Sequence, residues 1–187
     1  MKALIVSGTQ KIRTEIADIV KSSGSYDVAY APSVSAAFDE TSKDRYDLVI
    51  INSDSTEQAR ATASAIAKHD YGGVIFLENA SAYEKTRGRL SPLGIVVVAK
   101  PLSRTSLMTA VQTVHAANIR VAELKEVNKS LEQQLKDLKL IDRAKIALIT
   151  HFGYSEDEAH KYIEKQAMNQ RTTKREVAMN ILKTYEI

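Results

Sequence analysis

The chain has 187 residues, a length that allows one large domain or two small ones with buried cores. Hydrophobic residues make up 44% of the chain and charged residues 26%, an ordinary globular composition that argues against disorder. Because cysteine is absent, disulfides, thiol catalysis and Cys-ligated metal sites are excluded. No apolar run approaches the roughly 20 residues of a membrane span, so we expect a cytoplasmic protein without membrane contact. The net charge of +3 is too small to indicate a nucleic-acid partner.

The first half alternates short apolar runs with segments of helical periodicity. Runs at residues 4–6, 28–30, 48–51, 74–77 and 95–98 predict five buried strands. Near-continuous Val, Ile and Leu, as in several of these runs, is typical of parallel strands covered on both faces. The pattern predicts an α/β fold over residues 1–116, with a doubly wound five-stranded parallel sheet. The weakest predicted helix lies around residues 83–90, which include Gly88.

The middle of the chain has a heptad pattern. Residues 102–152 contain neither proline nor glycine, and two rows repeat every seven residues: Val114, Val121, Asn128 and Leu135, and Ala117, Leu124, Leu131 and Leu138. This pattern predicts a coiled-coil dimerisation helix over 117–140, with contacts at Val121, Leu124, Asn128, Leu131, Leu135 and Leu138. One polar residue, Asn128, within such a row favours a parallel two-stranded homodimer. The flanking charges do not reinforce the dimer, and the alternative is a long amphipathic helix packed on its own domain.

Two capping boxes organise residues 141–187. Ser155 with Glu158 and Thr173 with Glu176 each predict the start of a helix, and Gly153 suits the end of the preceding one. We therefore expect a small all-α unit of three helices.

Charge is locally separated within this unit. Residues 165–175 hold four basic side chains and no acidic one. Such a patch suits RNA phosphates, although a solvated helix face is the alternative. The predicted phosphate contacts are Arg143, Lys145, Lys165, Arg171, Lys174 and Arg175, and the predicted base or sugar contacts are Gln166 and Thr172.

The first half resembles a known fold. Its order of elements, with Lys100-Pro101 directly after the fifth strand, resembles the receiver domain of bacterial response regulators. Receivers carry an acidic pair for Mg²⁺ after the first strand, a phosphate-accepting aspartate after the third, a Thr or Ser after the fourth and a lysine after the fifth. The matching positions here hold Ser7 and Gly8, Asn52, Glu78 and Lys100.

These replacements remove the family's chemistry. Ser7 and Gly8 offer Mg²⁺ no charged ligand, and the amide of Asn52 is not a nucleophile. The resemblance therefore implies a pseudo-receiver with a degenerate phosphorylation site, in which Asp54 is the remaining alternative acceptor. We expect Lys100 to form a structural ion pair with Glu78 or Asp54.

Four blocks of the last segment follow the pattern of a known family: Ile141-Asp142-Arg143-Ala144-Lys145, residues 153–159, residues 166–171 and residues 174–178. With these blocks, residues 138–182 resemble the ANTAR domain of bacterial transcription antitermination regulators. The resemblance implies binding to paired stem-loops in leader transcripts, which prevents terminator formation. It also implies control through a sensor or regulatory protein that binds the pseudo-receiver. The alternative is a response regulator that acts through protein or DNA contacts without RNA.

No pattern indicates an enzyme. The sequence shows no nucleophile–base pair and no phosphate-binding Gly-rich loop. His151 and His160 have no second ligand at metal spacing. We expect no catalytic residue, no metal and no cofactor.

Overall fold

The computed structural model describes the chain except for residues 55, 69–71 and 186–187. The chain divides into two compact units, Met1–Ala122 and Glu123–Ile187. The strands of the first unit are β1 (Lys2–Val6), β2 (Asp27–Ala31), β3 (Leu48–Ile51), β4 (Gly73–Asn79) and β5 (Val96–Lys100). Its helices are α1 (Gln10–Ser23), α2 (Val34–Lys43), α3 (Glu57–Lys68), α4 (Tyr83–Leu90) and the first part of α5 (Arg104–Phe152). The second unit holds the rest of α5, α6 (Glu156–Gln170) and α7 (Lys174–Tyr185).

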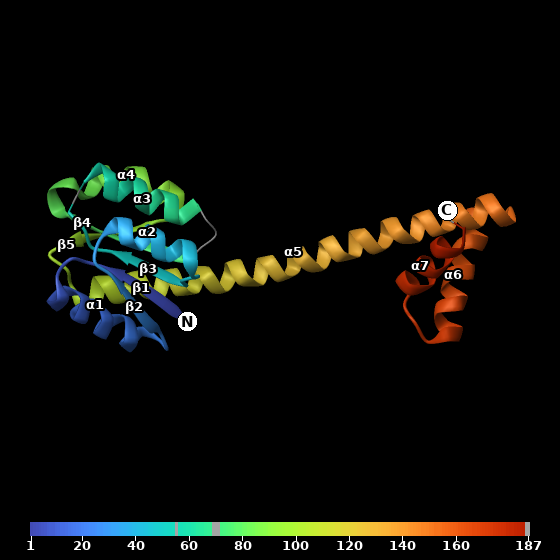
Figure 1. The fold of residues 1–187 in the computed structure, drawn as a ribbon, viewed down its shortest axis with the longest axis horizontal. Helices are drawn as coiled ribbons and strands as arrows, with labels where there is room; N and C mark the ends of the chain where they lie inside the picture. The colour runs from blue at the N-terminus through green and yellow to red at the C-terminus, as the bar shows by residue number, and fades with distance from the viewer. Residues whose placement is uncertain (55, 69–71, 186–187) are drawn as a thin grey trace. The chain divides into compact units, whose positions relative to one another are not determined.

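The five strands form one parallel sheet in the order β2-β1-β3-β4-β5. Helices α1 and α5 cover one face of the sheet, and α2, α3 and α4 cover the other (Figure 1). Because side chains alternate along a strand, Ile5 and Ile50 pack beneath α1 and α5, whereas Leu4 and Val49 pack beneath α2 and α3. The predicted doubly wound five-stranded parallel sheet is confirmed.

The weakest predicted helix does form, as α4. Its sequence is mostly polar, and only Thr86 and Leu90 are buried. Leu90 joins the core beneath α2 and α3. Thr86 donates a hydrogen bond to the carboxylate of Glu78 in β4, 2.7 Å away. Tertiary contacts therefore stabilise this helix, whose own apolar periodicity is weak.

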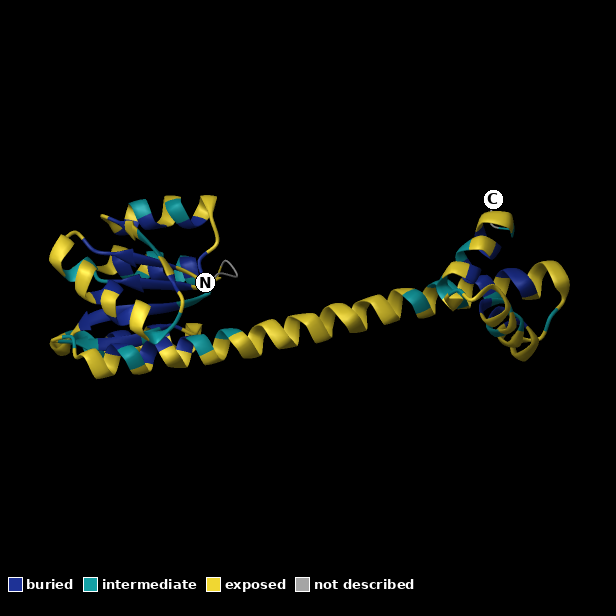
Figure 2. Cartoon of the chain, turned by 90° about the horizontal axis from the view of Figure 1, so that it is seen from below, coloured by how far each residue is buried: buried dark blue, intermediate teal, exposed yellow. Residues whose placement is uncertain are grey.

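Helix α5 has 49 residues and changes its surroundings along its length. Its first turns pack on the sheet through Leu107, Val111 and Val114. A Cβ at Gly73 would lie 2.2 Å from Cγ1 of Val114, so glycine at that position lets α5 approach β4. Val114, the first residue of the predicted heptad row, is therefore core of the first unit. Residues 119–136 are all exposed (Figure 2).

The second unit has its own small core. The end of α5 contributes Ala144, Ala147 and Leu148, and α6 and α7 pack against them. The capping box at Ser155 is formed: its hydroxyl accepts from the Glu158 N–H, and the Glu158 carboxylate accepts from the Ser155 N–H at 2.8 Å. Glycine is favoured at 153 because its φ is +70°. No helix in the described part of the chain combines the length and the apolar character that a membrane span requires.

Candidate functional site

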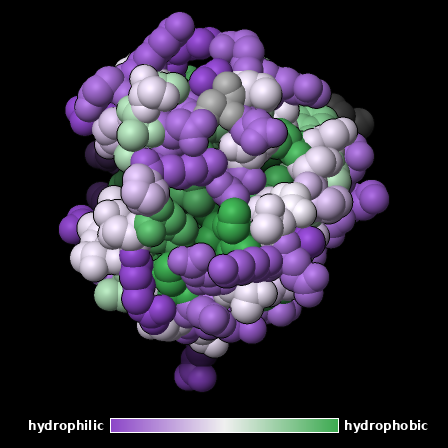
Figure 3. Space-filling view, turned by 90° about the vertical axis from the view of Figure 1, so that its left-hand side faces the viewer, coloured by the Kyte–Doolittle hydropathy of each residue, from purple (hydrophilic) through white to green (hydrophobic). Residues whose placement is uncertain are grey.

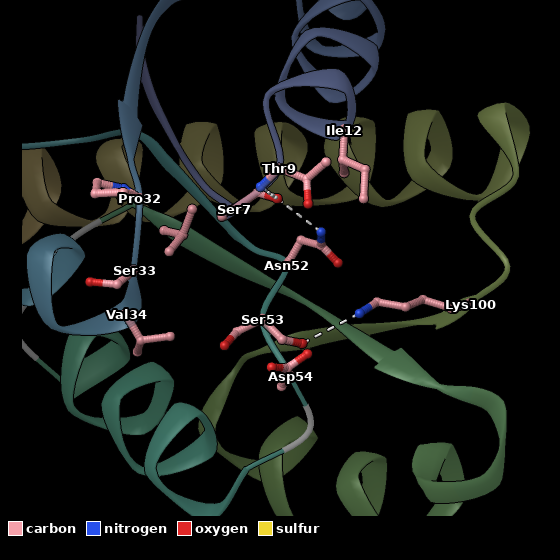
Figure 4. A pocket seen from close by; sticks show the side chains of 12 residues that line it. Ser7, Thr9, Ile12, Pro32, Ser33, Val34, Asn52, Ser53, Asp54 and Lys100 are labelled. Carbon is pink, nitrogen blue, oxygen red and sulfur yellow. Dashed lines mark hydrogen bonds between the residues drawn. The ribbon is translucent and has the colours of Figure 1, made fainter.

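A cavity of about 440 Å³ opens at the carboxyl ends of β1 and β3, the place where open parallel sheets bind ligands (Figure 4). Its lining includes the predicted degenerate site residues Ser7, Gly8, Asn52 and Lys100, together with Asp54. Glu78, the fifth predicted residue, does not line it. Figure 3 views this end of the first unit and shows apolar surface framed by hydrophilic side chains. Four of the five predicted residues therefore lie together around one cavity.

Asn52 and Ser7 form a neutral pair inside this cavity. The side-chain amide of Asn52 donates to Oγ of Ser7 at 3.1 Å, and the Asn52 backbone N–H donates to the carbonyl of Val6 at 2.8 Å. Ser7 is only 2% exposed. The pair places an amide and a hydroxyl where phosphoryl transfer needs a nucleophilic carboxylate and charged oxygen ligands.

Lys100 does not form the expected ion pair. Its ammonium group donates to the backbone carbonyl of Ser53 at 3.3 Å (Figure 4). Within the described residues, no carboxylate lies within 4.0 Å of this ammonium group, so the expected pairs with Glu78 and Asp54 are both wrong. Glu78 shares a sheet face with Phe76, which packs beneath α2 and α3. Lys100 follows Val98 by two residues and shares the opposite face, so the sheet separates the two charges.

Glu78 instead belongs to a buried polar cluster. Its carboxylate is fully buried and lies 3.2 Å from the guanidinium of Arg60 in α3. It also accepts from the Thr86 hydroxyl, and Arg60 Nε lies 3.1 Å from the same hydroxyl. The cluster joins β4, α3 and α4 at the strand end where receivers carry a Thr or Ser. Sequence reasoning missed Arg60; the available signal was a charged residue directly after buried Ala59.

Lys145 is held by acidic neighbours rather than presented to solvent. It forms ion pairs with Asp142 at 2.8 Å and with Glu156 at 3.1 Å, and its side chain is 16% exposed. Hydrogen bonds to Asp142 and then Glu156 raise the pKa of Lys145. The pair with Glu156 joins the end of α5 to the start of α6, whereas the pair with Asp142 lies within α5. The structure thus gives Lys145 a structural role in this unit, and its contact with phosphate stays a prediction.

Two further predicted cations have intramolecular partners. Lys174 pairs with Glu164 and holds α7 to α6, and Arg175 pairs with Asp137 of α5. The hydrogen bonds from these cations lower the pKa of both carboxylates. Each pair is partly exposed, so a phosphate can compete with the carboxylate for the cation.

The remaining predicted RNA contacts lie around the junction of α6 and α7. Lys165 and Arg171 are exposed, and neither forms an ion pair with another described residue. Arg143 is exposed on α5. Thr172 is half-buried, and its N–H donates to the carbonyl of Ala167 at 3.0 Å. Gln166 is half-buried and accepts from the amide of Gln170 at 3.1 Å.

The predicted dimerisation residues of α5 form an exposed apolar stripe. The exposed fractions are 47% for Val121, 63% for Leu124, 55% for Leu131, 54% for Leu135 and 59% for Leu138, and Asn128 is exposed among them. Unlike Val114, none of these residues is buried. Ile146 and Ile149, 62% and 38% exposed, continue the stripe beyond the predicted segment.

The described residues contain no group of three or more His, Asp or Glu side chains placed to hold a metal ion.

Comparisons with known proteins agree with this division into two parts. Residues 129–182 match the ANTAR domain family. The transcriptional regulatory protein PdtaR of Mycobacterium tuberculosis is 26% identical over 184 residues, which cover 98% of this chain and 90% of the relative. The aliphatic amidase regulator of Pseudomonas aeruginosa is 26% identical over 86 residues, covering 46% of this chain and 44% of that protein.

Solved structures match the first part in fold. The chemotaxis protein CheY4 of Vibrio cholerae superposes with a TM-score of 0.50 at 19% identity, over 60% of this chain and 97% of its own. A response regulator receiver domain protein from Clostridium thermocellum gives a TM-score of 0.55 at 16% identity, over 64% of this chain and 98% of its own. At these identities the likeness shows the fold alone. The resemblances to a receiver and to an ANTAR domain are both confirmed.

Proposed function

Because the chain joins a receiver fold to an ANTAR domain, we propose that it is a cytoplasmic transcription antitermination regulator that binds RNA. The ANTAR match over residues 129–182 carries the proposal. The regulators with which the chain shares sequence support the same class of function. The targets are paired stem-loops in leader transcripts, and binding prevents a terminator from forming.

Control does not pass through phosphorylation in this proposal. The neutral pair of Asn52 and Ser7 has no acceptor carboxylate, and Glu78 is tied to Arg60 rather than poised beside the cavity. A sensor or regulatory protein that binds the first unit therefore supplies the signal.

Incubating the protein with acetyl phosphate and Mg²⁺ should give no increase in mass. The Asn52 amide is not a nucleophile, and Ser7 and Gly8 hold no charged oxygen for the metal. Intact-mass spectrometry checks the expectation, with a receiver that retains its aspartate as the positive control. A phosphorylated peptide containing Asp54 would contradict it and identify that residue as a substitute acceptor.

The RNA surface that we propose centres on the junction of α6 and α7. Lys165 and Arg171 are its primary phosphate contacts, because they are exposed and form no ion pair among the described residues. Lys174 and Arg175 contribute when phosphate displaces Glu164 and Asp137. Neutralised phosphates release counterions, so binding through this surface depends on salt.

Replacing Lys165 and Arg171 together with alanine should weaken RNA binding and reduce the salt slope by about 2, one for each lost phosphate contact. Gel shifts with hairpin RNA at several salt concentrations measure both quantities. The double variant Lys21→Ala plus Lys43→Ala changes charge equally at exposed sites of α1 and α2 and should bind normally. If the first pair also binds normally, the surface is assigned wrongly.

The exposed stripe of α5 supports a homodimer. Its heptad spacing and Asn128 fit a parallel two-stranded coiled coil. Within the second unit, Leu138, Ile146 and Ile149 are exposed, whereas Ala144 and Ala147 of the same helix pack against α6 and α7. The dimer contact and the core of the unit thus use opposite faces of α5. In the proposed dimer, α6 and α7 of each copy face away from the axis, so two hairpins bind without competing for space.

A further inference from the structure

A shallow groove of about 210 Å³ lies between α6 and α7. Its polar lining comes from Tyr162, Gln166 and Gln170 of α6 and from Asn180, Thr184 and Tyr185 of α7. None of these side chains is a carboxylate, ammonium or guanidinium group. The groove therefore differs from the cationic surface beside it, and its lining suits a ligand that is polar but uncharged.

The amides in this groove are oriented by their own contacts. Gln170 donates to the side-chain oxygen of Gln166 at 3.1 Å, which leaves the amide N–H groups of Gln166 and the amide oxygen of Gln170 for a ligand. The Thr184 hydroxyl donates to the backbone carbonyl of Asn180 at 2.9 Å. No hydrogen bond within the described residues engages the side-chain amide of Asn180. The groove thus presents donors and acceptors side by side.

Apolar and aromatic surface completes the groove. Val177 and Ile181 are buried beneath it and contribute to its lining. Tyr162 and Tyr185 are half-buried, and each also packs against other rings, Tyr162 on Tyr154 and Tyr185 on Phe152. Phenol rings held in this way are stacking surfaces for flat heterocycles.

We propose that this groove binds one unpaired nucleobase of the RNA loop and reads its hydrogen-bonding edge. Amide side chains pair with base edges that present a donor and an acceptor together, and unstacked loop bases are the bases that proteins can reach in RNA. Lys165 directly precedes Gln166 on α6, so a phosphate held by Lys165 brings the adjoining nucleotide to the groove. The proposal rests on the RNA-binding function proposed above. It adds the base-reading residues Gln170, Asn180 and Thr184 to Gln166.

A selection experiment with the full-length protein tests the groove. The probe is a pool of hairpin RNAs that share one stem and have randomised loops. The wild type should enrich one base at a defined loop position. The variant Gln166→Ala plus Asn180→Ala should lose that preference and bind the enriched loop about 10- to 100-fold more weakly, with an unchanged salt slope. Lys165→Ala should instead weaken all loops alike and lower the slope.

Two controls isolate the groove. Asn169→Ala removes an exposed amide of α6 that does not line it, and should keep the base preference. An abasic nucleotide at the enriched position should weaken binding of the wild type as much as the double variant does, a measurement that needs no altered protein. Unchanged affinity for the abasic loop, with hairpin binding intact, overturns the groove and leaves the RNA-binding function standing. If the wild type binds no hairpin in the pool, both proposals fall.

Discussion

Replacing Glu78 with alanine should lower the free energy of unfolding of the first unit by about 3–5 kcal/mol. The carboxylate is fully buried, and its removal takes the buried ion-pair partner from the Arg60 guanidinium, whose side chain is 15% exposed and which also pairs with the exposed carboxylate of Glu57 at 3.6 Å. It also removes the acceptor of the Thr86 hydroxyl. A buried donor or charge that loses its partner still bears the cost of leaving water. Urea denaturation followed by circular dichroism measures the loss.

A matched double variant separates the ion pair from simple loss of packing. Glu78→Leu plus Arg60→Met removes both charges and retains most of the side-chain volume. Because a buried pair repays little more than its own desolvation, this variant should be much more stable than Glu78→Ala. A single Glu78→Ala variant as stable as the wild type would contradict the cluster as the structure shows it.

The strands of the first unit could be predicted from local sequence. Each strand is covered on both faces of the sheet and is therefore an apolar run. The same runs also indicate on which face of the sheet each side chain lies. Counting in twos from Phe76 and from Val98 places Glu78 and Lys100 on opposite faces of the sheet, which rules out their pairing. The resemblance to receivers, taken alone, predicted both residues at one site.

In the second unit, the ion pairs between helices are the feature that could not be predicted from the sequence. Lys145 and Lys174 both lie in basic stretches, and the sequence therefore predicts both as RNA contacts. Their partners, Glu156 and Glu164, lie on α6, and packing of the three helices brings these charges together. The amide groove has the same origin, since Gln166 and Asn180 meet only after α6 and α7 pack. By contrast, the capping box at Ser155 spans four residues and was predictable in full.

The heptad pattern predicts an apolar stripe on α5, and in the structure its predicted residues from Val121 to Leu138 are exposed. Val114 shares the heptad spacing but lies before the predicted segment of 117–140, and it packs in the sheet core beside Gly73. The predicted segment ended at residue 140, whereas exposed Ile146 and Ile149 extend the stripe. An apolar heptad position is equally suited to a partner helix and to the chain's own sheet, so periodicity alone does not distinguish them.

Replacing Leu131 with lysine should convert the proposed dimer into a monomer. Leu131 is 55% exposed in the single chain and lies at the middle of the stripe, where a charge would be buried against a second copy. Analytical ultracentrifugation should show the change. Ser130→Lys introduces the same charge on a neighbouring exposed position outside the heptad rows and should remain dimeric. A wild type that sediments as a monomer would contradict the proposed coiled coil.

Loss of the dimer should weaken binding to a two-hairpin RNA more than binding to a single hairpin. Two linked ANTAR domains bind the second hairpin intramolecularly, a gain of about 10²- to 10⁴-fold. Leu131→Lys should therefore lose this factor on a two-hairpin RNA, while its affinity for a single hairpin stays that of the wild type. Equal losses on both RNAs would mean that the stripe supports the RNA-binding unit itself.

Asn128→Leu, which keeps the stripe apolar, should retain association but alter the number or register of the helices, because the buried amide pair selects a parallel two-stranded arrangement.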